Sequence, residues 1–301
     1  MSRLEGYDVR FVDVGGVRIR LALAPRPETE PVRSLVLLGG RTEFVEKYAW
    51  AIADLRARGF HVATLDWRGQ GASARLLADG KRGHADDFQH FQQDLDALLA
   101  FAGEHLPQPW FGFAHSMGAL IMTERLVREP ERFRKVALSA PFYGLHAPAW
   151  QRVLGGPAVR LARRLGLGGR MLPGQPPAPA APEAMRADVL TTDLERFETY
   201  RELCRELPER LIGGVTVGWV AAALDAFDRL ARPGVVEAVT TPLLIMKAGN
   251  ERVVDPDGAA RMAARLPRAQ LVDFPGAEHE LMWERDATRN AVLAAMDDFL
   301  R

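Results

Sequence analysis

The chain has 301 residues and is formally neutral, with 39 lysine and arginine residues against 39 aspartate and glutamate residues. This length suits one α/β core with an inserted segment and excludes two full catalytic domains. Because no net charge steers the protein toward a polyanion, we expect no nucleic-acid partner.

The first predicted element is a β-hairpin. Residues 7–14 and 17–23 alternate in character, and Gly15 and Gly16 between them supply the positive φ angles of a two-residue turn. The chain is therefore expected to open with an antiparallel pair of strands.

After the hairpin, short apolar runs typical of strands alternate with helical patterns. The predicted strands cover residues 35–38, 60–65, 110–113, 135–139, 243–247 and 270–274. The predicted helices cover residues 46–58, 86–105, 117–128, 256–266 and 287–300. Such alternation is typical of βαβ units, so the predicted fold class is α/β, with a mostly parallel central sheet and helices on both faces.

One long, mostly helical segment interrupts this alternation. We therefore divide the chain into an N-terminal part of the core (1–141), a helical cap (142–238) and a C-terminal part of the core (239–301). An insertion after a parallel strand lies over the carboxyl edge of the sheet, where ligands bind in such folds. The aromatic residues of the cap either line a pocket there or form a small core of the cap itself: Trp150, Phe197, Tyr200, Trp219 and Phe227.

The strongest chemical signal is the sequence Trp-Phe-Gly-Phe-Ala-His-Ser-Met-Gly over residues 110–118. An apolar strand runs into a tight turn at Ser116 and then into a helical pattern, which is the context of a nucleophile elbow. The small residues Ala114 and Gly118 make room for the sharp turn, although Ala114 stands where the G-x-S-x-G pattern has glycine. Ser116 is the predicted nucleophile.

A serine hydroxyl needs a base within hydrogen-bonding reach, and His279 follows the last predicted strand at the same edge of the sheet. His84 and His146 are more distant alternatives. In this arrangement an acid orients the histidine and comes between serine and histidine in the chain. We favour Glu251 over Asp255, because Asp255 precedes Pro256 and a helical pattern and so has the signature of a helix N-cap.

The loop after the predicted strand 35–38 contains Gly39 and Gly40. Glycines at this point let the backbone approach the nucleophile closely, although an ordinary glycine turn is the alternative interpretation. The backbone N–H groups of Arg41 and Met117 are the predicted oxyanion hole.

Four segments carry a resemblance to a known family: residues 40–48 (Gly-Arg-Thr-Glu-Phe-Val-Glu-Lys-Tyr), 65–71 (Leu-Asp-Trp-Arg-Gly-Gln-Gly), 114–118 and 251–255. The chain resembles the bacterial lysophospholipase L2 family, which is similar to the monoacylglycerol lipases, over nearly its whole length. The resemblance implies an α/β-hydrolase that cleaves esters of single-chain acyl glycerol lipids under a helical lid. It also places the triad on Ser116, Glu251 and His279. Gly40, His115 and Trp219 are the residues expected to line the substrate pocket.

Other activities use the same fold and triad, so a monoacylglycerol lipase, a general carboxylesterase and an aminopeptidase remain alternatives. A long apolar tunnel favours a lipid substrate, whereas an acidic patch near Ser116 favours a peptidase. An inactive hydrolase-fold binding protein is the alternative from a different class. The sequence has no metal-binding histidine motif such as H-E-x-x-H and no phosphate-binding glycine loop, so we expect neither a metal nor a cofactor.

Residues 151–171 contain five arginines, no acidic residue and interleaved aliphatic residues. This pattern is typical of a basic amphipathic surface that contacts anionic membrane, and equally of a solvated helix. The arginines are Arg152, Arg160, Arg163, Arg164 and Arg170. The single cysteine, Cys204, and the lack of a signal-peptide pattern lead us to expect a cytoplasmic protein with peripheral membrane contact, whose oligomeric state stays open.

Overall fold

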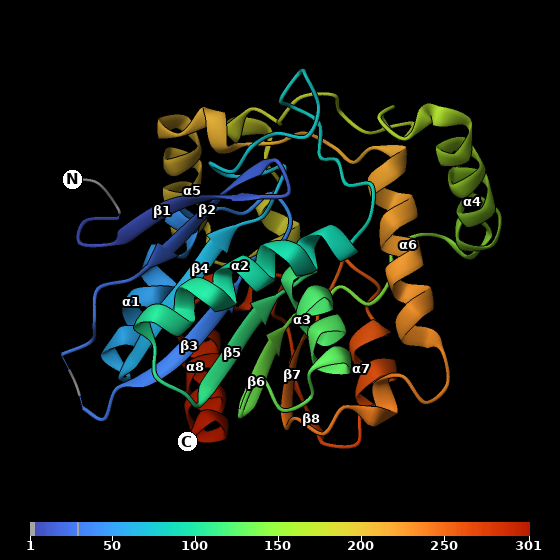
Figure 1. Ribbon diagram of the computed structural model, residues 1–301. Helices are drawn as coiled ribbons and strands as arrows, with labels where there is room; N and C mark the ends of the chain where they lie inside the picture. The colour runs from blue at the N-terminus through green and yellow to red at the C-terminus, as the bar shows by residue number, and fades with distance from the viewer. Residues whose placement is uncertain (1–3, 29) are drawn as a thin grey trace.

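An eight-stranded sheet forms the centre of the computed structural model, which describes residues 4–28 and 30–301, without the side chains of residues 149–153 (Figure 1). The strand order is β1-β2-β4-β3-β5-β6-β7-β8. Only the pairs β1–β2 and β2–β4 are antiparallel, and the other five pairs are parallel. The strands are β1 (Asp8–Val14), β2 (Val17–Leu23), β3 (Arg33–Leu38), β4 (Phe60–Asp66), β5 (Trp110–His115), β6 (Lys135–Ser139), β7 (Leu243–Ala248) and β8 (Ala269–Phe274).

Helices cover both faces of the sheet (Figure 1). The core helices are α1 (Ala49–Ala57), α2 (Gln89–His105), α3 (Met117–Arg128), α7 (Gly258–Ala263) and α8 (Asp286–Leu300). Short helical turns are η1 (Val45–Tyr48), η2 (Arg163–Leu167), η3 (Pro182–Ala184), η4 (Ala187–Val189), η5 (Pro208–Arg210), η6 (Val236–Ala238) and η7 (Leu281–Trp283). The predicted mostly parallel sheet with helices on both faces is therefore confirmed.

The alternation of side chains along β3 explains the two layers of core. Val36 and Leu38 pack in one buried cluster with residues of α2 and α3, whereas Leu35 and Leu37 pack in a second cluster with residues of α1 and α8. All four side chains have no exposed surface. A strand that is buried on both faces reads as a continuous apolar run, which is why these strands were predictable.

Three predicted helices differ in their bounds. The helix predicted over 86–105 begins at Gln89, the one over 46–58 is divided into η1 and α1, and the one over 256–266 is shortened to α7. Asp255 is not an N-cap, because α7 begins three residues later at Gly258. Instead, Asp255 Oδ1 accepts the Asp257 N–H at 3.2 Å and its carbonyl accepts the Gly258 N–H at 3.0 Å, so a turn precedes the helix.

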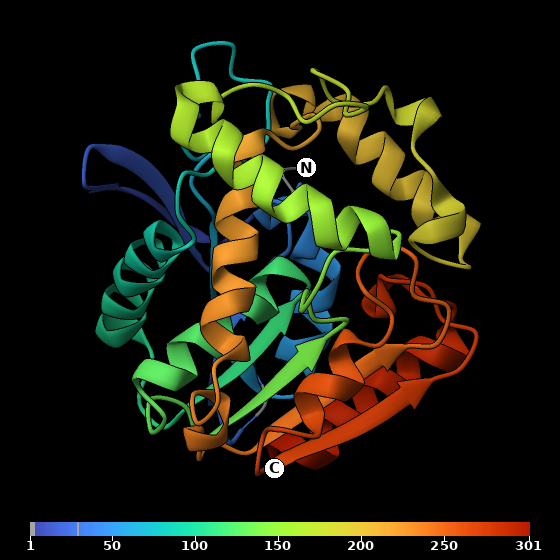
Figure 2. The ribbon, with the colours of Figure 1, turned by 90° about the vertical axis from the view of Figure 1, so that its right-hand side faces the viewer.

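The segment between β6 and β7 contains α4 (Ala149–Ala162), α5 (Leu194–Glu206) and α6 (Val217–Ala231) and lies over the carboxyl ends of the parallel strands (Figures 1 and 2). Its described aromatic residues pack against one another, as Phe197 and Tyr200 do, and also against residues of the core. Tyr200 stacks edge-on against Trp283 at 5.7 Å between ring centroids, and Trp219 packs against Phe88 at 5.6 Å. Trp150, also predicted to contribute here, lies outside the described side chains.

The tightest approach between helix and sheet is at Gly118 in the first turn of α3. A Cβ atom added at Gly118 would lie 2.5 Å from the Leu38 carbonyl oxygen and 2.6 Å from that of Gly39. Both neighbours are backbone atoms, so no side-chain rotation relieves the overlap.

We predict that Gly118→Ala lowers the free energy of unfolding by about 1–3 kcal/mol, because α3 must move away from β3. Urea unfolding followed by tryptophan fluorescence measures the change. Gly103→Ala in α2 is the matched control, since its Cβ would lie at an ordinary 3.8 Å from Trp110. Equal stability of the wild type and Gly118→Ala would show that the helix has room to move.

Candidate active site

Ser116 occupies the turn between β5 and α3. Its φ of 51° and ψ of −116° lie outside the usual regions for a residue with a side chain. The backbone holds it there: the Ser116 N–H donates to the Ser139 carbonyl at 3.0 Å, and its own carbonyl accepts the Ala119 and Phe142 N–H groups at 3.0 and 3.1 Å. The strand, turn and helix expected around Ser116 are thus present, and the strain is fixed by neighbouring β6 and α3.

His279 and Glu251 lie beside Ser116 although they are far from it in the chain. The Nε2 atom of His279 is 3.0 Å from the Ser116 Oγ, and its Nδ1 atom is 2.7 Å from Glu251 Oε2. Because a carboxylate only accepts hydrogen bonds, Nδ1 carries the ring proton and Nε2 accepts the serine hydroxyl. All three residues are buried.

The second oxygen of Glu251 is also occupied. Oε1 accepts the backbone N–H groups of Val253 and Val254 at 2.8 and 3.0 Å, which fixes the carboxylate in the loop after β7. The alternative acid, Asp255, has an ion pair at 2.5 Å with Arg261. The geometry therefore favours Glu251 as the partner of His279.

The pKa of His279 lies above its ordinary value of 6.5. Burial lowers this pKa, but the hydrogen bond that Nδ1–H donates to Glu251 and the negative charge of Glu251 together outweigh burial. Burial raises the pKa of Glu251, but the hydrogen bond with His279 and the positive charge of the protonated ring outweigh burial and lower this pKa. The carboxylate therefore stabilises the protonated imidazole.

The glycine-containing loop after β3 passes directly beside Ser116. A Cβ atom at Gly40 would lie 3.1 Å from the Ser116 Cβ, so only glycine allows this approach without displacement. The Glu43 carboxylate folds back on the loop and accepts the Gly40 N–H and, at 2.5 Å, the Tyr48 hydroxyl. Thr42 has a positive φ of 67°, which completes the tight turn.

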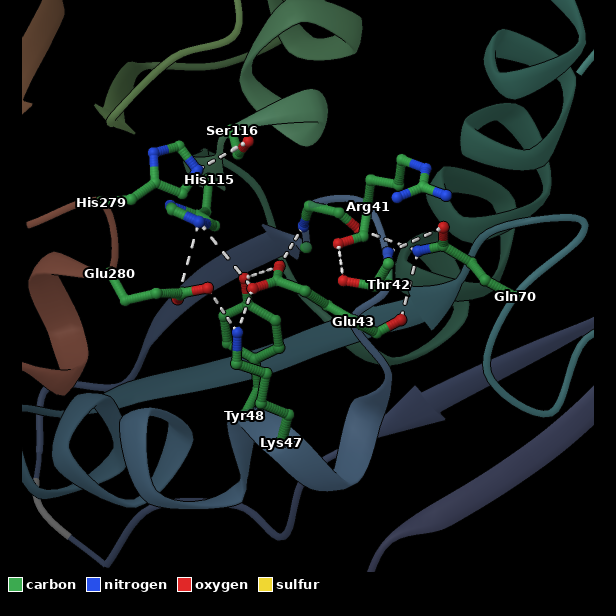
Figure 3. Close-up of polar contacts among 12 residues, drawn as sticks. Arg41, Thr42, Glu43, Lys47, Tyr48, Gln70, His115, Ser116, His279 and Glu280 are labelled. Carbon is green, nitrogen blue, oxygen red and sulfur yellow. Dashed lines mark hydrogen bonds and ion pairs between the residues drawn. The ribbon is translucent and has the colours of Figure 1, made fainter. Parts of the chain in front are cut away.

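The sequence patterns did not predict a cluster of buried charged residues beside this loop (Figure 3). Its members are Glu43, Lys47, His115 and Glu280. The Lys47 ammonium lies 2.5 Å from Glu43 Oε1 and 2.6 Å from Glu280 Oε1. His115 Nε2 lies 3.6 Å from Glu280 and 3.8 Å from Glu43, and burial lowers its pKa, which favours the neutral ring. Glu43 and Lys47 have helical spacing, but no sequence signal shows that Glu280 meets them.

Glu43, His115 and Glu280 have ligand atoms within 4.8 Å of one another, a spacing that a metal ion can bridge. Lys47 contacts both carboxylates, however, and so already supplies a positive charge at this point. The cluster is therefore explained by ion pairing and hydrogen bonding, and we assign no metal to it.

A cavity of about 740 Å³ opens beside Ser116 and His279. Gly40, His115 and Trp219 line it, as do Arg41 and Met117, whose amides were expected to form an oxyanion hole. Apolar residues and glycines of α4 and α6 are part of its lining: Gly155, Gly156, Val159, Val220, Leu224 and Phe227. Polar residues also line it: Arg41, Thr42, Glu43, Lys47 and Glu280.

Comparison with known proteins gives the family. A family model described as serine aminopeptidase S33 matches residues 29–286. The chain belongs to this hydrolase family. It is 31% identical over 284 residues to a probable lysophospholipase L2 of Haemophilus influenzae, a match that covers 91% of this chain and 86% of the relative. It is 33% identical over 286 residues to lysophospholipase L2 of Escherichia coli, covering 89% of this chain and 80% of the relative.

This hydrolase also resembles a solved monoglyceride lipase from Saccharomyces cerevisiae, with a TM-score of 0.75, 19% identity and coverage of 98% of this chain and 95% of that one. That likeness confirms the α/β-hydrolase fold. The family resemblance read from the sequence motifs is confirmed as well. In the part of the chain that the structure describes, no helix is long and apolar enough to cross a membrane.

The raised pKa of His279 predicts the acid side of the activity profile. The base must be neutral, so kcat/KM falls as the pH drops through a pKa above 6.5. Hydrolysis of p-nitrophenyl butyrate across the pH range measures this midpoint. In Glu251→Gln we expect the midpoint to move to lower pH and the rate to fall by about 10⁴-fold, because both the charge and the tautomer are lost.

Asp255→Asn is the matched control for Glu251→Gln. Its carboxylate pairs with Arg261, so we expect a rate within a few-fold of the wild type and no displacement of the pH midpoint. Equal losses in the two variants, or a larger loss in Asp255→Asn, would overturn the assignment of Glu251.

Proposed function

We propose that this hydrolase cleaves the ester bond of single-chain lipids of the lysophospholipid type, with Ser116 as nucleophile, His279 as base and Glu251 as the acid. The observation that carries the proposal is the cavity beside Ser116, whose lining by apolar residues of α4 and α6 suits a single acyl chain. The relatives that are named lysophospholipase L2 support it.

The proposed mechanism is two-step acyl transfer. His279 takes the proton of Ser116 as the oxygen attacks the ester carbonyl, and the imidazolium then returns the proton to the departing alcohol. The Met117 N–H belongs to the first turn of α3, where backbone N–H groups have no carbonyl acceptor within the helix. Together with the Arg41 N–H it stabilises the oxyanion. Water repeats the cycle on the acyl-enzyme and releases the fatty acid.

The charges near Ser116 argue against an aminopeptidase, although the family description names one. A peptidase needs a carboxylate that is available for the substrate amine. Here three described carboxylates line the cavity, and each has a cation beside it: Glu43 and Glu280 contact Lys47, and Asp255 pairs with Arg261. An inactive binding protein also accounts poorly for the linked hydrogen bonds of Ser116, His279 and Glu251.

We further propose that residues 142–238 act as a cap and that α4 and η2 touch a membrane surface. Four leucines in this region are exposed by 43–68%: Leu154, Leu161, Leu165 and Leu167. Figure 2 shows α4 on the outside of the inserted segment, crossing α6. Exposed aliphatic residues on the outer helix of an inserted segment suit insertion at the boundary of headgroups and acyl chains.

The arginines of this surface fall into two groups. Arg160 pairs with Asp225 and Asp228, and Arg163 pairs with Asp225, so their charges are compensated within the protein. Arg164 and Arg170 are exposed. The side chain of Arg152 lies outside the described residues. The proposed contact with anionic lipid, at the cytoplasmic face of a membrane, thus rests on fewer charges than the sequence suggested.

A hydrolysis panel tests the proposed activity. We expect the purified wild type to release fatty acid from lysophosphatidylcholine and lysophosphatidylethanolamine, and Ser116→Ala to lose at least about 10⁴-fold of that rate, since the nucleophile is gone. The panel includes monoacylglycerol, p-nitrophenyl butyrate and aminoacyl anilides. Turnover confined to short esters or anilides would retain Ser116 as nucleophile and reject the lipid substrate.

Vesicle binding tests the membrane contact. Replacing Leu161 and Leu165 by serine should weaken sedimentation with phosphatidylglycerol vesicles by roughly tenfold or more, because each leucine loses its apolar contact with the bilayer. Leu194→Ser is the control, since Leu194 is 67% exposed but begins α5 rather than lying on α4. Equal losses in both variants would exclude α4 as the contact.

A further inference from the structure

Arg41 is the one pocket arginine among the described residues, and its charge is not compensated within the protein. Its side chain donates to the Gly213 carbonyl, its Nε is buried without a hydrogen-bond partner, and no described carboxylate lies within 4.0 Å of the guanidinium. The undescribed side chains cannot supply one, because Met1, Ser2, Arg3, Thr29 and residues 149–153 include no aspartate or glutamate.

Arg41 is partly exposed, whereas the fully buried arginines of this protein are all paired with carboxylates. Arg20 pairs with Glu46 and Asp66, Arg68 pairs with Asp94, and Arg125 pairs with Asp96 and Glu129, all at 2.5–2.6 Å. The fold thus compensates the guanidinium groups that it buries completely. Arg75 is partly exposed like Arg41 and donates only to backbone carbonyls, but it does not line the cavity beside Ser116. Arg41 differs from it because its uncompensated charge lies where a ligand of this cavity can reach it.

The position of the Arg41 guanidinium indicates which part of a substrate it can contact. The Arg41 side chain extends away from Ser116 and lies above Thr42 and Gln70 in the view of Figure 3. The guanidinium carbon lies 5.5 Å from the centre of the Trp219 ring, and burial lowers the pKa of Arg41 to about 10, so the group remains charged near neutral pH. An uncompensated cation therefore lines the cavity that contains Ser116, close to the first turn of α6.

We propose that the Arg41 guanidinium binds the phosphate of the lysophospholipid headgroup and so makes phosphate, rather than the acyl chain, the group that distinguishes the substrate from a neutral monoacylglycerol. The proposal rests on the function proposed above. In a lysophospholipid the glycerol unit separates the ester carbonyl from the phosphate. The Arg41 amide and side chain would then contact the two ends of that unit.

Arginine suits this task because its planar N–H groups match the oxygens of a phosphate. The phosphate is the part of the headgroup that all lysophospholipids share, whereas amines and alcohols beyond it differ. Glu43 and Glu280 are occupied by Lys47 and offer no comparable site for a headgroup amine. A neutral monoacylglycerol would leave the guanidinium uncompensated on binding.

A purely structural role for Arg41 predicts a different result, and Arg82 provides the comparison. Arg82 likewise donates from the core to a carbonyl of the inserted segment, that of Gly169, but it pairs with Asp79 at 2.6 Å and does not line the cavity. If Arg41 only held the inserted segment in place, Arg41→Met and Arg82→Met would alter all substrates alike.

The first experiment compares kcat/KM for octanoyl lysophosphatidylcholine with that for monooctanoylglycerol, both below their micellar concentrations. In Arg41→Met we expect the ratio of the two values to fall by about tenfold to a hundredfold, with most of the change in the KM of the lysophospholipid, because a charge-assisted hydrogen-bond pair is lost. Arg41→Lys should restore part of the ratio, and Arg82→Met should leave it unchanged. An unchanged ratio in Arg41→Met would overturn the proposal while leaving the esterase function intact.

The second experiment does not depend on turnover. Calorimetry measures the binding of glycerol 3-phosphate and of inorganic phosphate to Ser116→Ala and to the same protein with Arg41→Met added. Weaker binding of glycerol 3-phosphate in the double variant supports the proposal. Equal binding in both proteins, or an effect seen with inorganic phosphate alone, rejects a headgroup site. Failure of the wild type to hydrolyse any lipid would instead refute the proposed function.

Discussion

The site depends on the strained backbone at Ser116. A φ of 51° at a residue with a side chain is costly, and it persists because hydrogen bonds from β6 and α3 fix the turn on both sides. The same turn brings α3 so close to β3 that Gly118 lies against two backbone carbonyls. Ser116, the loop after β3 and the first turn of α3 therefore form one rigid unit, on which the hydroxyl and the Met117 amide have fixed positions.

The buried charged side chains around that unit lie next to groups of opposite charge. Glu251 stabilises the protonated form of His279, Lys47 links Glu43 to Glu280, and Glu43 in turn holds the Gly40 amide and the Tyr48 hydroxyl. Each buried charge in this chain of contacts has an opposite charge beside it, which is the condition under which burial is tolerated. The loop that carries the Arg41 amide is thus held by side chains that contact neither acyl chain nor headgroup in the proposed mechanism.

Much of the fold and the hydrolase family could be predicted from the sequence, because they depend on local patterns and short motifs. Apolar runs predicted the strands, and the turn at Ser116 follows from the residues on either side of it. The bounds of α7 were wrong because Asp255 and Pro256 suggest a cap, whereas the backbone forms a turn first. The contact of Glu280 with Lys47 was missed because it joins segments 233 residues apart, and no local pattern records such a meeting.

The unpaired charge of Arg41 likewise could not be predicted from local sequence patterns. A sequence shows that an arginine follows Gly40, but only the fold shows that no described carboxylate pairs with it, whereas the fully buried arginines are paired. The loop after β3 supplies a backbone donor to the reacting carbonyl in α/β-hydrolases, so the identity of the side chain at that position does not decide whether the donor is present. A change of side chain at this position can therefore alter the preferred headgroup without moving the catalytic groups, which suits the range of ester substrates that one hydrolase frame supports.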